Sequence, residues 1–368
     1  MRRFRIAVIP GDGVGREVVP AGQRVLEAAT TGEAVLEWHV FPWGSDYYRA
    51  TGAMMPADGL EQLRHFDAIY LGAVGDPPHI PDHITLWGLL LPIRKRFDLY
   101  VNVRPIRLLP GIRGPLREKG PEQIDMVFVR ENTEGEYAGV GGRVHEGTPH
   151  EVALETAVFS RFNVERVARY AFELARSRRK HLTSITKSNA QRYGMVLWDE
   201  VIQQVAQDYP DVTVTSLLVD AAAALMVRAP ERFDVVVGSN LFADILTDLG
   251  GALMGSLGLP PSANLAFDRR FPSLFEPVHG SAPDIAGRGI ANPIGTIWAG
   301  AMMLEHLGLP TAAHRILRAL ERLTLEGTVL TPDLGGRATT DDVAERVIEL
   351  LAESAKEPSD ADHAYPAP

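Results

Sequence analysis

Residues 235–251 read Val235-Val-Val-Gly-Ser-Asn-Leu-Phe-Ala-Asp244-Ile-Leu-Thr-Asp248-Leu-Gly-Gly251. A short apolar run, typical of a buried strand, breaks at Gly238-Ser-Asn240, where a helical pattern begins. Asp244 and Asp248 are four residues apart, so both carboxylates lie on one face of that helix. The repulsion between the two negative charges costs roughly a few tenths of a kcal/mol in an isolated helix. A hard divalent cation such as Mg²⁺ would offset this repulsion. A solvated acidic face is the alternative, but its neighbours are apolar: Leu241, Phe242, Ile245, Leu246 and Leu249.

Strands and helices alternate along the rest of the chain. The apolar runs predict strands at Phe4–Ile9, Val35–Phe41, Ala68–Ala73, Leu99–Val103, Ile124–Arg130, Val152–Phe162, His181–Thr186, Val212–Val219 and Val235–Val237. The helical patterns fall at Val14–Ala29, Ala57–His65, Thr85–Arg96, Val164–Ser177 and Ala190–Gln207, and through most of Ala291–Leu351. This alternation predicts an α/β fold with a largely parallel sheet.

Length and composition bound the function. The chain has 368 residues, a net charge of −10 and no cysteine. Disulfides, thiolate nucleophiles and cysteine-ligated zinc are therefore excluded, and the acidic balance disfavours a nucleic-acid partner. No apolar run is long enough for a membrane span, and the N-terminus reads as a first strand rather than a signal sequence. We expect a soluble, cytoplasmic protein of about two domains' length.

The segment Ile9-Pro-Gly11-Asp-Gly13-Val-Gly15-Arg16 is partly similar to the Rossmann dinucleotide-binding motif. It follows a strand, opens a helix and has Glu37 about 20 residues further on. The pattern G-x-G-x-x-G requires glycine where this chain has Arg16. We therefore interpret the segment as a tight turn between strand and helix rather than a Rossmann phosphate loop.

A third aspartate, Asp220, follows the predicted strand Val212–Val219. Ligand sites of α/β sheets gather at the carboxyl ends of strands, and three carboxylates suit Mg²⁺ or Mn²⁺. A helix N-cap is the other interpretation of Asp220, and the two roles are compatible.

Three arginines, Arg94, Arg104 and Arg130, are candidates for binding carboxylates. Arg104 and Arg130 directly follow apolar runs, and a guanidinium fits a carboxylate with two parallel hydrogen bonds. A surface salt bridge is the competing interpretation, which we keep for Arg96.

Tyr137 and Lys187 are candidates for proton transfer. Tyr137 lies in a polar loop, and Lys187 lies at a strand end, where burial can lower the pKa of a lysine. Taken singly, each is better explained by packing or surface exposure than by catalysis. The segment Phe275–Pro293 is predicted to be a long loop rich in small residues, in which Asp284 is suited to hydrogen-bond a ribose diol.

Several motifs together resemble the β-decarboxylating dehydrogenases, the family of isocitrate and isopropylmalate dehydrogenases. The resemblance runs in order from residue 4 to about 352 and includes Gly72-Ala-Val-Gly75, Asn102-Val-Arg104-Pro105, Arg130-Glu-Asn-Thr-Glu-Gly135, Thr186-Lys187-Ser-Asn189, Asn240–Asp248 and Glu276-Pro-Val-His279-Gly-Ser-Ala-Pro-Asp284. Within the family, Trp43–Tyr48, Met54–Asp58 and Pro81-Asp-His-Ile-Thr-Leu-Trp-Gly88 resemble the branch that acts on tartrate and D-malate.

The resemblance implies an isopropylmalate dehydrogenase-like two-domain fold that differs from the Rossmann fold. Residues 1–100 together with 253–355 would form a large dinucleotide-binding domain, and residues 101–252 a small domain for dimerisation and metal binding. Residues 356–368 are expected to be a disordered tail. The resemblance also implies a homodimer with shared active sites; assembly to a tetramer stays open.

The same resemblance assigns roles residue by residue. Arg94, Arg104 and Arg130 would bind the substrate carboxylates, and Tyr137 and Lys187 would be catalytic, with Lys187 supplied by the other subunit. Asp244 and Asp248 would bind Mg²⁺ or Mn²⁺ together with the other subunit's Asp220. The dinucleotide would be held by His279, Gly280, Ser281, Ala282, Asp284, Ile285 and Asn292.

The implied activity is NAD-dependent oxidative decarboxylation of a 2-hydroxy dicarboxylic acid, D-malate or tartrate. Asp284-Ile285 is typical of the NAD form, because NADP-using relatives place Lys-Tyr there. A 3-isopropylmalate dehydrogenase is the nearest alternative. A silent regulatory subunit is disfavoured because the catalytic residues are all present, and a metal-free Rossmann dehydrogenase is disfavoured by Arg16. The substrate choice would depend on Trp87, His83, Thr85 and Leu90, and a need for a monovalent cation such as K⁺ stays open.

Overall fold

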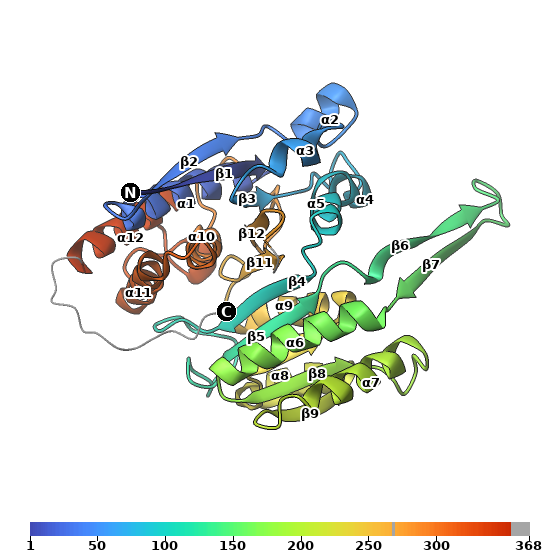
Figure 1. Cartoon of the computed structure of the whole chain (residues 1–368). Helices are drawn as coiled ribbons and strands as arrows, with labels where there is room; N and C mark the ends of the chain where they lie inside the picture. Colours follow the sequence, from blue (N-terminus) through green and yellow to red (C-terminus); the bar gives the residue numbers. More distant parts are fainter. Residues whose placement is uncertain (267–268, 355–368) are drawn as a thin grey trace.

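A ten-stranded mixed sheet runs through the molecule (Figure 1). The structure is a computed structural model that describes residues 1–266 and 269–354. The strand order is β2-β1-β3-β12-β11-β4-β5-β10-β8-β9. Neighbouring strands are parallel in both outer parts, whereas β12–β11, β11–β4 and β4–β5 are antiparallel. The prediction of a largely parallel sheet is confirmed, with an antiparallel centre that was not foreseen.

The strands of this sheet are β1 (Arg2–Gly11), β2 (Ala34–Val40), β3 (Ala68–Ala73), β4 (Val101–Arg107), β5 (Asp125–Glu131), β8 (His181–Thr186), β9 (Thr213–Leu218), β10 (Val235–Gly238), β11 (Pro261–Leu265) and β12 (Ser273–Pro277). The helices are α1 (Gly15–Thr30), α2 (Ser45–Thr51), α3 (Gly59–Leu63), α4 (Asp82–Thr85), α5 (Leu91–Arg96), α6 (Arg161–Ser177), α7 (Gly194–Ala206), α8 (Val219–Arg228), α9 (Asn240–Leu253), α10 (Ile294–His306), α11 (Pro310–Glu326) and α12 (Thr340–Ser354). A π-helical turn, Leu86–Leu90, joins α4 to α5.

Helices cover the sheet because each buries an apolar stripe against it. Helix α1 packs on β3 and on α10, α11 and α12, all from the C-terminal part of the chain, while α6 and α9 pack on β5 and β10. Chain segments far apart in sequence therefore share one core. The start of α9 is fixed by Ser239, whose hydroxyl accepts a hydrogen bond from the Phe242 N–H at 3.4 Å.

A two-stranded antiparallel arm, β6 (Gly135–Val144) and β7 (Val152–Val158), projects from the body of the molecule (Figure 1). Among the described residues, four of its large apolar side chains are exposed: Val140, Val144, Val152 and Leu154, the last by 65%. An isolated two-stranded hairpin is marginally stable in water.

Several predicted boundaries are wrong. The segment Val152–Phe162 is not one strand, because β7 ends at Val158 and the Ser160 hydroxyl caps α6, which begins at Arg161. The predicted loop Phe275–Pro293 begins only after Pro277, since Phe275–Pro277 belong to β12. Strands β6, β11 and β12 were not predicted, because they are short or contain glycine and proline.

The interpretation of residues 9–16 as a tight turn is confirmed. Gly11 and Gly13 have φ values of +70° and +51°, which favour glycine. Arg16 donates through Nε to the carbonyl oxygen of Gly11 at 3.1 Å, which closes the turn. The predicted disordered tail, residues 356–368, lies outside the described residues. Within the described ranges, none of the helices has the length and apolar character that a bilayer crossing requires.

Candidate functional site

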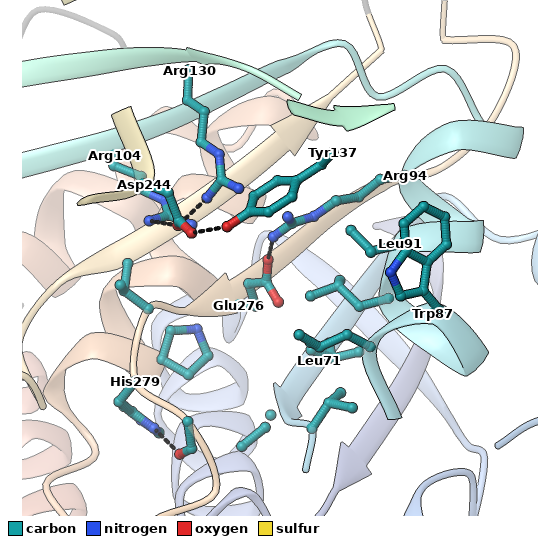
Figure 2. A pocket seen from close by; sticks show the side chains of 18 of the residues that line it. Leu71, Trp87, Leu91, Arg94, Arg104, Arg130, Tyr137, Asp244, Glu276 and His279 are labelled. Atoms are coloured by element: carbon teal, nitrogen blue, oxygen red, sulfur yellow. Dashed lines mark hydrogen bonds and ion pairs between the residues drawn. The ribbon is translucent and has the colours of Figure 1, made fainter. Parts of the chain in front are cut away.

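A cavity of about 410 Å³ opens where β3 and β12 end. Such strand ends are where α/β sheets place ligands. The cavity is lined by the three candidate arginines, Arg94, Arg104 and Arg130, together with Tyr137 and Asp244 (Figure 2). The remaining lining residues are Leu71, Gly72, Ala73, Val74, His83, Leu86, Trp87, Leu90, Leu91, Glu276, Pro277, Val278, His279 and Gly280.

Asp244 is the point on which the polar side chains converge (Figure 2). Arg104 Nη1 donates to Asp244 Oδ1 at 3.2 Å, and Arg130 Nη1 donates to the same oxygen. The hydroxyl of Tyr137 donates to Asp244 Oδ2 at 2.9 Å. Two guanidiniums and a phenol from three different elements therefore meet at one carboxylate of α9.

Local contacts hold these elements together. Glu136, next to Tyr137, accepts hydrogen bonds from the Ser239 hydroxyl and the Leu241 N–H, each at 3.2 Å, at the start of α9. Asn240 accepts from Arg130 Nε at 3.1 Å and from Arg130 Nη2 at 2.7 Å. The first turn of α9 is thus tied to β5 and β6, which places Asp244 one turn further inside the cavity.

Burial and like charge both act on the arginines. Burial lowers the pKa of Arg130 to about 9, and the positive charge of Arg104 adds to the effect. Burial also lowers the pKa of Arg104. For Asp244, burial favours the neutral acid, but the charges of Arg130 and Arg104 outweigh it and the pKa falls. Burial and the Asp244 charge raise the pKa of Tyr137, so its hydroxyl stays protonated. The cavity is therefore rich in positive charge and holds one protonated acid.

Arg94, which also lines the cavity, pairs with Glu276, a residue that the sequence did not single out for a role. Its Nη2 donates to Glu276 Oε1 at 2.7 Å, and both side chains are buried (Figure 2). A buried ion pair holds its geometry only when further hydrogen bonds satisfy it. Asn264 Nδ2 donates such a hydrogen bond to Glu276 Oε1 at 3.0 Å.

An apolar wall faces the arginines. Trp87, 43% exposed, lines it, and the Lys95 ammonium lies 4.3 Å from the indole centroid. Gly139 makes room for this ring, since a Cβ there would lie 2.3 Å from Trp87 Cη2. The predicted wall residues Trp87, His83 and Leu90 do line the cavity. The prediction for Thr85 is wrong: its side chain is fully buried and its hydroxyl donates to the Asp82 carbonyl oxygen.

Lys187 and Asp220 lie outside the cavity of their own chain. They follow the neighbouring strands β8 and β9, of which β9 is the edge strand, and Lys187 Nζ lies 2.9 Å from Asp220 Oδ1. The Asp220 side chain is 66% exposed, and hydrogen bonding to Lys187 lowers its pKa. The two form one unit at the molecular surface, where a second copy of the chain can reach them.

The segment after β12 carries the predicted dinucleotide-binding residues. His279 and Gly280 line the cavity, and Ser281, which is buried, accepts through its carbonyl oxygen from the Val14 N–H at 2.9 Å. Asp284 is exposed, while Ile285 and Ala282 pack against Val14. Asn292 is buried and donates to Asp333 Oδ2 at 2.9 Å. These residues lie along one irregular segment that runs from the cavity past the turn at Gly13.

The carboxylates of α9 fit a divalent cation. Asp244 and Asp248 are one helical turn apart, and burial together with the Asp244 charge raises the pKa of Asp248. A cation between them would relieve that repulsion. Within residues 1–266 and 269–354, three or more acidic or histidine side chains do not gather into a cluster that could hold a metal. A third ligand would have to come from another chain, as the prediction for Asp220 requires.

Comparisons with known proteins agree with these features. The family model described as isocitrate/isopropylmalate dehydrogenase matches residues 5–347. A probable tartrate dehydrogenase/decarboxylase of Agrobacterium vitis is 57% identical over 357 residues, which are 96% of this chain and 99% of the relative. The D-malate dehydrogenase (decarboxylating) of Escherichia coli K12 is 54% identical, with 95% and 99% covered. The crystal structure of isocitrate dehydrogenase from Methylococcus capsulatus superposes with a TM-score of 0.84 at 37% identity, covering 95% of this chain and 99% of that one.

Proposed function

The chain belongs to the isocitrate/isopropylmalate dehydrogenase family, and from this premise we propose that it oxidatively decarboxylates a 2-hydroxy dicarboxylic acid, D-malate or tartrate, with NAD. With D-malate the products are pyruvate, CO₂ and NADH. The family relationship carries the reaction type, and the relatives named for tartrate and D-malate carry the substrate class.

The observation that supports this substrate class most strongly is the placement of three buried arginines, Arg94, Arg104 and Arg130, around one cavity. Guanidiniums taken out of water require anions as partners, and a planar fork matches a carboxylate. The three arginines repel one another, and among the described residues the only acidic side chains that line the cavity with them are Asp244 and Glu276. A small dicarboxylate would supply two negative charges between the arginines.

The proposed chemistry uses two protein groups for proton transfer. Lys187 of a second copy accepts the proton of the 2-hydroxyl as hydride leaves C2, which gives a β-keto acid. Loss of CO₂ then leaves an enolate, and Tyr137 protonates its carbon. Tyr137 suits this role because its hydroxyl is protonated and lies at the cavity surface against Asp244.

When bound, NAD would supply the hydride acceptor, and a divalent metal would supply Lewis-acid stabilisation of negative charge on oxygen. We propose that Asp244 and Asp248, with Asp220 of a second copy, hold Mg²⁺ or Mn²⁺. The segment from His279 to Asn292 is proposed to hold NAD, with Asp284 facing the ribose. A monovalent cation such as K⁺ is an open addition to this set.

We further propose that residues 1–100 with 253–355 form a large domain and residues 101–252 a small one. The order of strands supports this, because β4, β5, β10, β8 and β9 all come from the middle of the chain. A homodimer is proposed to unite Lys187 and Asp220 with the cavity of a second copy. The exposed arm and Ile245, 57% exposed on the outer face of α9 beside Asp244, support an interface there.

A 3-isopropylmalate dehydrogenase is the second candidate. The leucines Leu86, Leu90 and Leu91 that line the cavity favour a substrate with an alkyl group. Trp87 argues against it, because its indole occupies part of that wall. D-malate has no alkyl group to place there.

The reaction type is tested by product stoichiometry. The purified protein is incubated with D-malate, NAD and Mn²⁺, and NADH, CO₂ and pyruvate are measured together. Equal amounts of the three products are expected, with loss of all three on addition of EDTA and recovery with excess Mn²⁺. Formation of NADH and oxaloacetate without CO₂, or full activity in EDTA, would contradict the proposal.

A further inference from the structure

Buried polar side chains cross the antiparallel centre of the sheet. All five residues of β11 are buried, yet Ser262 and Asn264 at alternate positions of this strand are polar. Asn264 is the register partner of Asn102 on β4 and lies diagonally across from Glu276 on β12. An amide at such a position must find partners, because an unsatisfied buried polar group costs about 1–3 kcal/mol.

Asn264 joins the residues that hold two of the cavity arginines. Its Nδ2 donates to Glu276 Oε1 at 3.0 Å, the oxygen that also accepts from Arg94. Its Oδ1 accepts from Asn102 Nδ2 at 2.9 Å. Asn102 Oδ1 in turn accepts from Arg104 Nε at 2.7 Å. A continuous path of four hydrogen bonds therefore runs Arg94–Glu276–Asn264–Asn102–Arg104.

A second branch extends the path to β5. Asn132, directly after β5, donates through Nδ2 to Asn264 Oδ1 at 2.9 Å and to the Leu99 carbonyl oxygen at 2.9 Å. The Asn264 amide thus fixes contacts from β12, β4 and the end of β5 at once. Networks of buried side-chain hydrogen bonds rigidify their surroundings, although here Asn132 Oδ1 and Arg94 Nε have no partner among the described residues.

The arginines need such anchoring because they repel one another. Arg94 and Arg104 carry like charges into the same cavity, and each has a neutral or acidic residue behind it that fixes its direction. Glu276 holds Arg94 and Asn102 holds Arg104, but these two holders lie on different strands, β12 and β4. Asn264 on the strand between them is the one side chain among the described residues that bonds to both.

We propose that Asn264 is a positioning residue for substrate binding: it sets the spacing and direction of Arg94 and Arg104 through Glu276 and Asn102 without touching the substrate. This inference rests on the proposed function, in which both arginines bind the substrate carboxylates. Preorganised donors lose much of their effect when displaced by about 1 Å.

The first test is Asn264→Leu, which keeps the branching and the number of heavy atoms of the side chain and removes both hydrogen-bonding ends. The KM for D-malate is expected to rise by about tenfold to a hundredfold, while the KM for NAD stays unchanged. The affinity for D-malate measured by calorimetry without NAD should fall by the same factor. Unchanged D-malate affinity, or equal increases in both KM values, would overturn the proposal.

The second test is Asn264→Asp, which keeps the acceptor for Asn102 and Asn132 but places a second carboxyl against Glu276. The charged groups nearest to this carboxyl pair are Arg94, which donates to Glu276, and Arg104, which donates to Asn102. The second carboxyl cannot replace the amide donor to Glu276 and adds a like charge beside it, so the D-malate KM is expected to rise relative to the wild type. A D-malate KM equal to that of the wild type would contradict the proposal.

A control separates positioning from a general loss of stability. Thr324→Val on α11 removes a buried hydroxyl that donates to the Leu320 carbonyl oxygen at 3.1 Å, far from the cavity residues in sequence. It is expected to lower the melting temperature without changing the KM for D-malate. The wild-type protein reports on the proposed function itself: an inactive wild type refutes that function, whereas an active wild type with a normal Asn264→Leu variant refutes only this inference.

Discussion

At the scale of single residues, Asp244 already accepts three hydrogen bonds with which a bound metal would compete. Arg104 and Arg130 share its Oδ1, and Tyr137 holds its Oδ2. A metal at Asp244 would compete with the guanidiniums for the same oxygens. We therefore expect the arginines to exchange Asp244 for the substrate carboxylates when metal and substrate bind together, which makes the two binding events mutually favourable.

The cofactor preference is tested at Asp284 and Ile285. The double substitution Asp284→Lys with Ile285→Tyr replaces an exposed carboxylate, which would repel a 2′-phosphate, by a cation. The ratio of kcat/KM for NAD to that for NADP is expected to fall by at least about tenfold, a change equivalent to about 1.4 kcal/mol. Steady-state rates with both cofactors measure the ratio.

The control is Asp341→Lys, which makes the same charge change at an exposed position of α12. It should leave the cofactor ratio unchanged. If the double variant keeps the wild-type preference for NAD, Asp284 does not face the ribose, and the assignment of the segment after β12 loses its main support.

The sequence could identify the cavity arginines, Tyr137 and Asp244, because each lies in a motif of contiguous residues. It could not identify Glu276 and Asn264 as their partners, since these contacts join residues far apart in sequence across the sheet. The available signal was the polar alternation Ser262, Asn264 in a short apolar segment, which a buried strand shows only when the polar groups are paired.

At the scale of elements, the strands that were missed are those whose stability depends on their neighbours. Strands β11 and β12 have five residues each and are bounded or interrupted by proline, so their own pattern is that of a loop. They form because β3 and β4 flank them on both sides. The long periodic helices, α1, α6 and α11, were predictable because their apolar stripes alone specify them.

Helix α10 carries a partly buried acid near its C-terminus that affects stability. Burial raises the pKa of Glu305 from 4.5 to about 7. The unfolded chain therefore ionises first as pH rises, and folding loses stability between about pH 4.5 and 7. The substitution Glu305→Gln removes this loss, so the variant should gain stability relative to the wild type on going from pH 5 to pH 8, by at most about 3 kcal/mol. Melting temperatures at the two pH values test it.

Glu349→Gln on α12 is the matched control, because Glu349 is 63% exposed and pairs only with a surface arginine in the described contacts. Its effect on the melting temperature should be small and similar at both pH values. Parallel pH dependence of the wild type and Glu305→Gln would show that Glu305 titrates normally in the folded protein.

At the scale of the whole molecule, Lys187, the proposed catalytic base, lies outside the cavity that contains Tyr137. Lys187 and Asp220 pair with each other at the edge of the sheet, away from Tyr137 and Asp244. A symmetric dimer can place this pair of one subunit at the cavity of the other. Such a dimer would contain the composite site that the sequence resemblance implies and that we propose.

Mixed dimers test whether the sites are shared. Tyr137→Phe and Lys187→Met are each expected to be inactive alone. A dimer with one copy of each contains one site with intact Tyr137 and Lys187, so co-expressed chains with different tags should yield a mixed dimer with about half the wild-type activity per dimer. If the purified mixed dimer is as inactive as its parents, Lys187 and Tyr137 act within the same chain.

The most direct measurement is the rate of NADH formation with a panel of 2-hydroxy dicarboxylates, NAD and Mn²⁺, with K⁺ present and absent. The cavity, with its three buried arginines and Trp87 in the facing wall, predicts that kcat/KM for D-malate or tartrate exceeds that for 3-isopropylmalate by at least about tenfold, within the range that one pocket contact supplies. A kcat/KM that is highest for 3-isopropylmalate would contradict the proposed function.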